Sequence, residues 1–147
     1  MLRVEDPSSV LGPSALSGRW IKSPTGSLTA SWSSSSVSFF FFGTKLSFQA
    51  GPGTGRQLGI SNGGTPMIAI RVGPTEEATL KSSAYWQTVQ DPEANSEVLI
   101  LDETTHPHLQ KKQKTFVQII LIDWISTFEL SALIYDDVSG FLPCFFF

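Results

Sequence analysis

Residues 114–137, KTFVQIILIDWISTFELSALIYDD, decide the fold of this chain. They contain two apolar runs that predict two β-strands meeting at the corner Asp123-Trp124. The first run, residues 115–122, is apolar on both sides, although alternate residues of a strand point to opposite faces. A strand with this pattern is usually covered on both faces. The other residues offer too little apolar material to cover both, so the stretch predicts a domain that packs against a partner.

The composition is typical of one globular domain. A chain of 147 residues fits a single domain and can bury roughly 70% of its unfolded surface. Hydrophobic residues make up 41% of the chain, charged residues make up 16%, and the formal net charge is −3. The sequence therefore lacks the basic footprint of a nucleic-acid-binding protein. A single cysteine, Cys144, excludes an internal disulfide framework.

No targeting or membrane segment is visible in the sequence. The N-terminal MLRVEDPSSVLGPSAL lacks the apolar core of about 7–15 residues that a secretory signal contains. No apolar run reaches the roughly 20 residues of a membrane helix. We therefore expect a soluble chain without a membrane partner. Its compartment stays open: cytoplasmic as written, and secreted if a leader precedes it.

The organisation along the chain predicts an all-β protein. Short runs rich in Ser, Thr, β-branched and aromatic residues alternate with Gly, Pro and Asn clusters, and helical periodicity is hard to find. This pattern predicts a jelly-roll β-sandwich of about nine to ten short antiparallel strands. The expected strands are residues 18–22, 27–32, 36–42, 44–50, 66–73, 78–82, 84–89, 96–102, 114–122 and 127–136.

Three segments follow from this organisation. We expect residues 1–17 to be an irregular lead-in and residues 18–138 to form the β-sandwich accessory domain. Residues 139–147 end in FLPCFFF and have no polar face. Such an apolar tail is either the truncated start of a further domain or translated non-coding sequence.

Two phenylalanines break the alternation expected for strand 36–42. Val37, Phe39 and Phe41 share one face, which predicts that this face points inward. Phe40 and Phe42 fall on the opposite face, where serines precede them. Two aromatic side chains on an outer face either cover a sheet edge or form a contact patch, and we favour the contact patch.

Two short motifs resemble catalytic or phosphate-binding loops. Residues 59–63, GISNG, match the nucleophile elbow G-x-S-x-G, with Ser61 as its nucleophile. That elbow needs a helix after the serine, whereas a strand is expected here, and Asn-Gly favours a turn. Residues 51–56, GPGTGR, lack the Gly-Lys-Ser/Thr ending and the following helix of a phosphate-binding loop. We expect both segments to be turns.

Two further clusters could hold a metal or act as an acid–base pair. His106 and His108 lie two residues apart, with Asp102 and Glu103 as nearby carboxylates. Pro107 points to a loop, and no third ligand is evident, so we expect a solvated loop without metal. Asp136 and Asp137 are adjacent and would point to opposite faces of a strand, so a strand-end turn is expected.

The four tryptophans can either pack in the core or contact a ligand. Flat aromatic side chains on a sandwich can stack on sugar rings, and the indole N–H can bind a hydroxyl. The alternative is that they fill the core or close its ends. We assign Trp20 and Trp32 to the core, whereas Trp124 follows a corner and suits a rim position. Trp86 stays without an assignment.

The order and spacing of several short motifs resemble a known domain. The motifs are Gly18-Arg19-Trp20, residues 29–32 (TASW), residues 37–44 (VSFFFFGT), residues 117–124 (VQIILIDW) and Phe128-Glu129-Leu130. Together they resemble the N-terminal jelly-roll domain of two-domain SGNH/GDSL-type acylhydrolases, especially the fungal relatives of carbohydrate esterase family 2. The resemblance covers about residues 16–138 and makes the stretch 114–137 the expected closing edge of the sandwich.

The resemblance implies chemistry that lies outside these residues. In such proteins a flavodoxin-like catalytic domain follows the jelly roll, with a Gly-Asp-Ser block and a late Asp-x-x-His. Neither motif occurs here, so no catalytic residue is carried over, and we expect no cofactor and no metal. Hydrolysis of acyl esters on carbohydrates would belong to a hydrolase domain that is missing or separate.

Three hypotheses follow from the sequence. The first is an accessory domain that docks an SGNH hydrolase domain and presents a glycan ester. The second is a free-standing carbohydrate-binding module, and the third is an independent hydrolase that uses Ser61 with His106 or His108. The candidate glycan-contact or domain-interface residues are Trp20, Trp32, Phe40, Phe42, Asp123 and Trp124.

Overall fold

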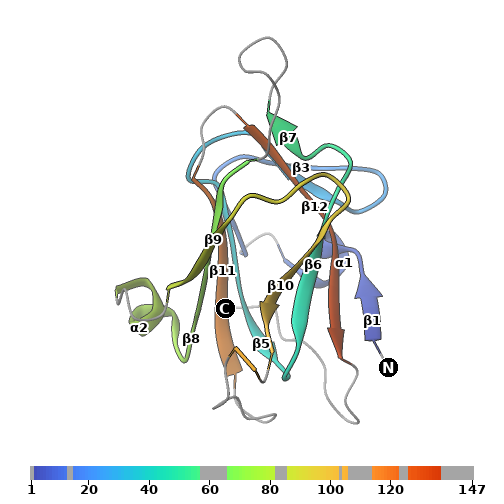
Figure 1. The fold of residues 1–147 in the computed structure, drawn as a ribbon. Coiled ribbons are helices and arrows are strands. Elements are labelled where there is room, and N and C mark those ends of the chain that lie inside the picture. The colour runs from blue at the N-terminus through green and yellow to red at the C-terminus, as the bar shows by residue number, and fades with distance from the viewer. Residues whose placement is uncertain are drawn as a thin grey trace.

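Two antiparallel β-sheets pack face to face in the computed structural model (Figure 1). The structure describes residues 2–12, 15–56, 66–81, 86–102, 104–105, 114–122 and 126–136. One sheet has seven strands and the other has five, and every pairing among the described strands is antiparallel. The prediction of an all-β sandwich is therefore confirmed, while the finer assignment to a jelly roll stays a prediction.

The elements have the following bounds. The larger sheet contains β1 (Leu2–Glu5), β3 (Trp20–Lys22), β4 (Leu28–Ala30), β6 (Leu46–Ala50), β7 (Gly55–Arg56), β10 (Glu97–Leu101) and β12 (Ser126–Asp136). The smaller sheet contains β2 (Leu16–Ser17), β5 (Ser36–Phe42), β8 (Ile68–Gly73), β9 (Trp86–Gln90) and β11 (Lys114–Leu121). The two short helices are α1 (Pro7–Val10) and α2 (Glu76–Lys81). No described helix has the length and apolar character needed to span a membrane.

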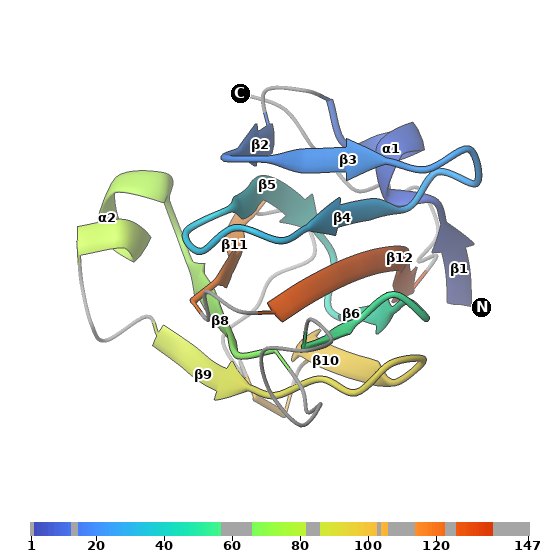
Figure 2. The same ribbon diagram turned by 90° about the horizontal axis from the view of Figure 1, so that it is seen from above.

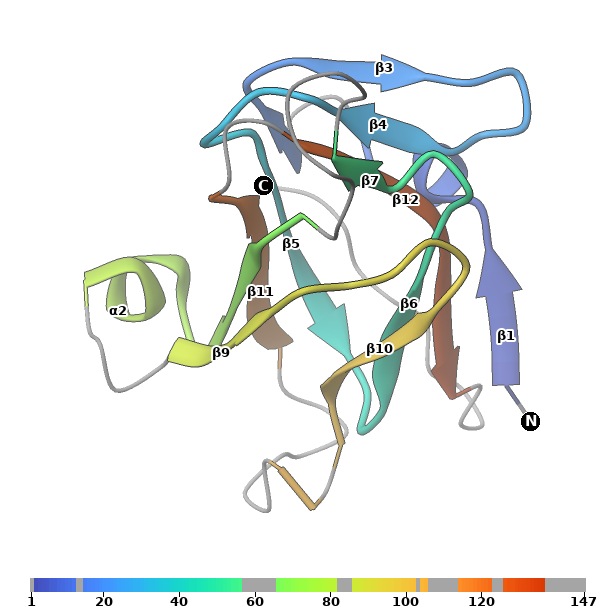
Figure 3. The same ribbon diagram turned by 45° about the horizontal axis from the view of Figure 1, so that its top comes forward.

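The two strands of the decisive stretch belong to different sheets. β11 lies between β5 and β8 in the smaller sheet, whereas β12 pairs with β4, β6, β1 and β7 in the larger one. In Figure 3, β1 lies beside the second half of β12. Both strands have hydrogen-bonded neighbours on both sides, so the prediction of a closing edge is wrong. Each strand is instead central to its own sheet.

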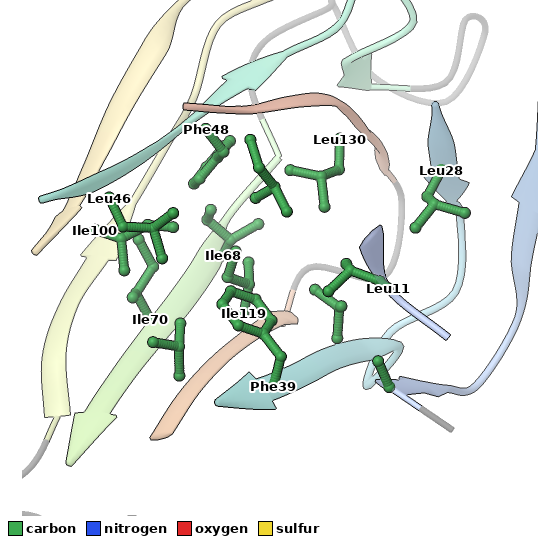
Figure 4. Close-up of a cluster of buried hydrophobic side chains, with 14 of the residues drawn as sticks. Leu11, Leu28, Phe39, Leu46, Phe48, Ile68, Ile70, Ile100, Ile119 and Leu130 are labelled. Atoms are coloured by element: carbon green, nitrogen blue, oxygen red, sulfur yellow. The ribbon is translucent and has the colours of Figure 1, made fainter. Parts of the chain in front are cut away.

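The hydrophobic core fills the space between the sheets. The alternating apolar residues of β5, β8 and β11 face those of β6 and β12, as the labelled side chains in Figure 4 show. Phe39, Phe48 and Phe128 are completely buried. Burial of each aromatic side chain contributes several kcal/mol, about 3–5 by truncation to alanine. The predicted inward face of residues 37–41 is thus confirmed.

The opposite face of β11 points away from the core. Phe116 lies on this outer face and is fully buried, Ile120 is half-buried, and Ile122 just beyond the strand is 38% exposed. Helix α2 packs beside β8 and β11 (Figure 2). It comes so close that a Cβ at Gly73, which pairs with Phe116, would collide with Thr79. Among the described residues, the outer face is therefore closed at the Phe116 end and partly exposed at the Ile122 end.

Two parts of the predicted element pattern were wrong. The expected strand 78–82 is helix α2, because the Thr75 hydroxyl accepts a hydrogen bond from the Ala78 N–H at 3.1 Å and caps the helix. An ion pair of 3.0 Å between Lys81 and Glu77 supports the same turn. Residues 1–17, expected to be irregular, contain β1, α1 and β2. Pairing with the long strand β12 orders β1, and a short sequence carries no signal of such a distant partner.

Candidate ligand and docking surfaces

Trp20 is a structural anchor at the start of β3. Its half-buried ring packs edge-on against Phe128, with 6.4 Å between the ring centroids. Its indole N–H donates to the backbone carbonyls of Ser17 and Ser36, each at 3.1 Å. The side chain packs against the core cluster as predicted. Because its N–H is already bonded within the protein, it has no free donor for a sugar hydroxyl.

Trp32 lies on the surface, contrary to its assignment to the core. Its side chain is 57% exposed. The alternation of β4 ends at Ala30, and Trp32 follows in the loop to β5, outside the space between the sheets. The guanidinium carbon of Arg19 stands 4.3 Å from the ring centroid, which is a cation–π contact. Nothing in the sequence pattern identifies Arg19 as a partner of this ring.

Backbone hydrogen bonds hold the loop that carries Trp32. Ser35 N–H donates to the Trp32 carbonyl at 3.1 Å, and Ser34 N–H donates to the Leu121 carbonyl at 2.7 Å. The Ser35 hydroxyl accepts from Arg19 N–H at 3.2 Å. Gly18 adopts a positive φ of 87°, and a Cβ there would lie 2.7 Å from the Ser35 hydroxyl. The loop and the turn before β3 are therefore fixed against each other.

Phe40 and Phe42 both lie half-buried near the outer face of the smaller sheet. Phe40 pairs in register with Phe116, and the two rings meet edge-to-face with centroids 5.4 Å apart. Phe42, at the end of β5, packs against the core cluster. These residues thus contribute to packing, and the contact patch proposed for them stays a prediction.

A row of apolar residues continues across the same face. Ile120 of β11, Ala69 of β8 and Val89 of β9 are neighbours in register. The Ile122 N–H donates to the Met67 carbonyl at 3.0 Å, which adds a second pair at the end of the row. Met67, Val89 and Ile122 are 39%, 53% and 38% exposed, whereas Ile120 is half-buried and Ala69 is fully buried. We call Met67, Ala69, Val89, Ile120 and Ile122 the outer patch.

The loop 51–56 cannot act as a phosphate cradle. The Glu129 carboxylate occupies it and accepts from the Gly53 N–H and from the Ser27 hydroxyl, each at 2.7 Å. Gly51 packs so tightly on this carboxylate that a Cβ would collide with it. The negative charge of the Glu129 carboxylate would repel a phosphate. The carboxylate also already accepts the Gly53 N–H, which a phosphate would need as a donor. The expectation of a turn is confirmed.

Two aspartates weighed above as ligands or acid–base groups serve turns. Asp136 accepts from the Thr44 hydroxyl at 2.9 Å and from the Lys45 N–H at 3.2 Å, which closes the turn between β5 and β6. Asp102 accepts from the N–H of Thr105 at 2.8 Å and from its hydroxyl at 3.1 Å. These bonds, the backbone one first, lower the pKa of Asp102. Both carboxylates thus have local structural roles.

Several predicted site residues lie outside the described part of the chain. They are Asp123, Trp124, His106, His108, Glu103, Asp137 and the segment 59–63 with Ser61. The strand that carries Trp86 is described, but its side chain is not. Within the described ranges, no group of three His, Cys, Asp or Glu residues could hold a metal ion.

Comparison with solved structures finds carbohydrate-active proteins. A family two carbohydrate esterase from Cellvibrio japonicus is similar over 98% of this chain and 36% of that chain, with a TM-score of 0.64 and 17% identity. A family two carbohydrate esterase from Clostridium thermocellum, solved in complex with cellohexaose, is similar over 88% of this chain and 32% of that chain, with a TM-score of 0.56 and 15% identity.

A carbohydrate-binding module is similar as a whole. The CBM36-1 domain of a multidomain xylanase from the hindgut metagenome of Trinervitermes trinervoides matches 94% of this chain and 98% of that chain. Its TM-score is 0.54 at 9% identity. No protein-family model and no curated protein matches the sequence. At these identities the likeness shows a shared β-sandwich fold, and this chain spans about a third of the length of the esterase chains.

Proposed function

We propose that this chain is an accessory β-sandwich domain of an SGNH-type carbohydrate esterase and that it docks the hydrolase domain. The outer patch is the observation that supports this role most. Its exposed members lie together on one sheet face, and exposed apolar clusters of this kind mark interaction sites. In the similar esterases about two-thirds of each chain lies outside the matched part, which leaves room for a second domain.

Docking through the outer patch also accounts for the two-sided apolar character of residues 115–122. One face of β11 supplies the core; on the other face α2 packs against Gly73, the register partner of Phe116, while Ile122 is 38% exposed. A hydrolase domain against Ile120, Ile122 and Val89 would cover what α2 leaves exposed. Phe40 and Phe42 pair with Phe116 and Lys114 at the other end of β11, so they would take part only if the interface extends along the whole strand. Asp123 and Trp124, which directly follow Ile122 in sequence, are further candidates.

The docking is tested with an SGNH-type hydrolase domain encoded in the genome that encodes this chain. Sedimentation velocity of the two separately produced domains should show a complex. Val89→Asp should weaken it by about tenfold or more, because a desolvated unpaired charge is costly at an apolar interface. Ile21→Asp is the matched control, because Ile21 is 72% exposed on a strand of the other sheet. Failure of the wild-type chain to bind, or equal weakening by both substitutions, would contradict the proposal.

A second candidate function is glycan contact, either as part of the esterase or as a free-standing carbohydrate-binding module. The exposure of Trp32 favours it, since an aromatic ring held on a fixed loop can stack on the apolar C–H face of a sugar. Affinity electrophoresis in gels that contain soluble polysaccharides tests this function. Trp32→Ala should abolish retardation in the gel, and Ile21→Ala should leave it unchanged. Retardation that survives Trp32→Ala would contradict a role for this ring.

A further inference from the structure

Arg19 and Trp32 form one composite surface at the end of the sandwich. The guanidinium carbon lies 4.3 Å above the indole centroid, yet the indole remains 57% exposed. Arg19 itself is exposed and makes no ion pair with a carboxylate in the described ranges. An exposed ring and a cation without an acidic partner among these residues thus stand side by side.

The backbone that carries the two residues is held in place before any ligand binds. The Arg19 backbone N–H donates to the Ser35 hydroxyl at 3.2 Å, and Ser35 in turn bonds Leu121 of β11 through its carbonyl at 2.9 Å. The close approach of Gly18 to Ser35 fixes the turn that precedes Arg19. A backbone that is already ordered loses little conformational entropy on binding, and this favours affinity for small ligands.

The chemistry of the pair defines a ligand class. A guanidinium that lies over an aromatic ring still carries N–H donors at its edge, and two of them can bind a carboxylate in a bidentate manner. The indole offers an apolar face to the C–H groups of a sugar ring. A ligand that satisfies both groups carries a carboxylate on, or next to, a pyranose ring. A neutral sugar would satisfy the ring alone.

We infer that Arg19 and Trp32 bind an acidic glycan, with the guanidinium on the carboxylate of a uronic acid and the indole against a sugar ring. This inference rests on the proposed glycan contact and adds the substrate class to it. Arg19 is the residue that confers the preference for the acidic form. The docking proposal is independent of it, because the outer patch lies on β8, β9 and β11 and in the residues that flank them.

Isothermal titration of the full chain with three matched probes tests the inference. The probes are xylotetraose, the same oligosaccharide with a glucuronic acid branch, and the methyl ester of that branched form. The acid should bind about tenfold more tightly than the other two, and added NaCl should reduce only this difference. Arg19→Gln should remove the preference for the acid. Arg19→Lys should keep only part of it, because an ammonium lacks the paired N–H donors that bind both carboxylate oxygens.

Two variants complete the design. Lys22→Gln removes another exposed cation of the same hairpin and should leave all affinities unchanged. Trp32→Phe keeps an aromatic ring and should retain more affinity than Trp32→Ala. Thermal unfolding midpoints equal to that of the wild type establish that each variant is folded.

The outcomes separate the inference from the proposals it builds on. Equal binding of the acid and its methyl ester, unaffected by Arg19→Gln, would overturn the acidic class while leaving glycan contact intact. Absence of binding to every saccharide at millimolar concentration would overturn both glycan contact and this inference. Binding of polyphosphate as tight as that of the uronate, with the same dependence on Arg19, would also overturn it, because the surface would then select charge alone.

Discussion

At the residue scale, Glu129 is the side chain on which the turn from Gly51 to Thr54 depends. It accepts two hydrogen bonds of 2.7 Å, one from the Gly53 N–H and one from the Ser27 hydroxyl. Its own backbone N–H binds the Thr54 hydroxyl at 3.0 Å, and its carbonyl accepts from Gly51 N–H at 2.7 Å. The side chain thus joins β12 to two loops that are far apart in sequence.

Glu129→Ala should lower the free energy of unfolding by about 2–4 kcal/mol, because it removes two charge-assisted hydrogen bonds. Urea denaturation measures this change. The matched control is Glu97→Ala, since Glu97 is exposed and its carboxylate accepts a single bond of 3.1 Å from Ser47. That change should cost less than about 1 kcal/mol. Equal costs for the two substitutions would show that the turn does not depend on Glu129.

Asp102 provides a pH test of local structure. Hydrogen bonds from Thr105, first from its N–H, lower the pKa of this carboxyl in the folded state. Its stabilising effect is therefore present above the pKa of the unfolded chain and is lost as the pH falls through the lower folded value. Thr105→Val removes the hydroxyl and keeps the N–H, so the pKa of Asp102 should rise only part of the way to the ordinary value. Carbon-detected NMR titration measures it; an unchanged pKa would contradict this role of the hydroxyl.

Residues in loops are the ones that sequence patterns predict least well. Period-two alternation assigned Phe39 and Phe41 to the core, because each strand residue has only two possible directions. Trp32 follows the end of β4, where alternation no longer applies, and its assignment to the core was wrong. Arg19 stands next to Trp20 in sequence and yet stacks on Trp32, a contact set by the meeting of two loops. No spacing in a single sequence predicts such a contact.

At the element scale, β11 separates the core from the outer face. Ile119 points into the core and is 1% exposed, whereas its neighbour Ile120 lies half-buried on the outer patch. The two positions carry the same residue type on opposite faces of one strand. They therefore allow a direct comparison of the two faces.

Ile119→Ala should destabilise the isolated chain by about 3–4 kcal/mol, because it leaves a cavity in a closed core. Ile120→Ala should cost roughly half as much or less, since its side chain loses less buried area. Thermal or urea unfolding of the two variants measures the difference. If Ile120→Ala cost as much as Ile119→Ala, the outer face would already be closed and unable to accept a partner.

The elements that a sequence predicts well are those defined by local pattern. β5 spans Ser36–Phe42, as predicted, because Val37 and four phenylalanines, all strand-forming residues, end at Gly43. β1 was missed because its formation depends on pairing with β12, more than 120 residues later. Helix α2 was missed although Thr75 followed by two glutamates is a capping signal. Its apolar positions are too few to show a helical period.

At the scale of the whole molecule, the apolar residues on both faces of β11 predict a partner from the sequence alone. In the folded chain this strand lies at the centre of the smaller sheet, and three residues of the outer patch, Met67, Val89 and Ile122, stay exposed. The similarity to a family two carbohydrate esterase, at 17% identity, shows a shared β-sandwich fold. The sequence does not predict which face of the sandwich would dock the partner. The row Ile120, Ala69 and Val89 forms only when strands distant in sequence pair.

The transcript around the codon for Phe147 gives the most direct test of the central claim, that this sandwich serves a carbohydrate esterase. Long-read sequencing of the mRNA would show the full open reading frame that contains the codons of this chain. We predict a reading frame that continues into an SGNH-type domain, with a Gly-Asp-Ser block within the next few tens of residues and a late Asp-x-x-His. A frame that encodes the sandwich without any hydrolase domain, in a genome that encodes no separate SGNH-type domain able to bind it, would contradict the claim.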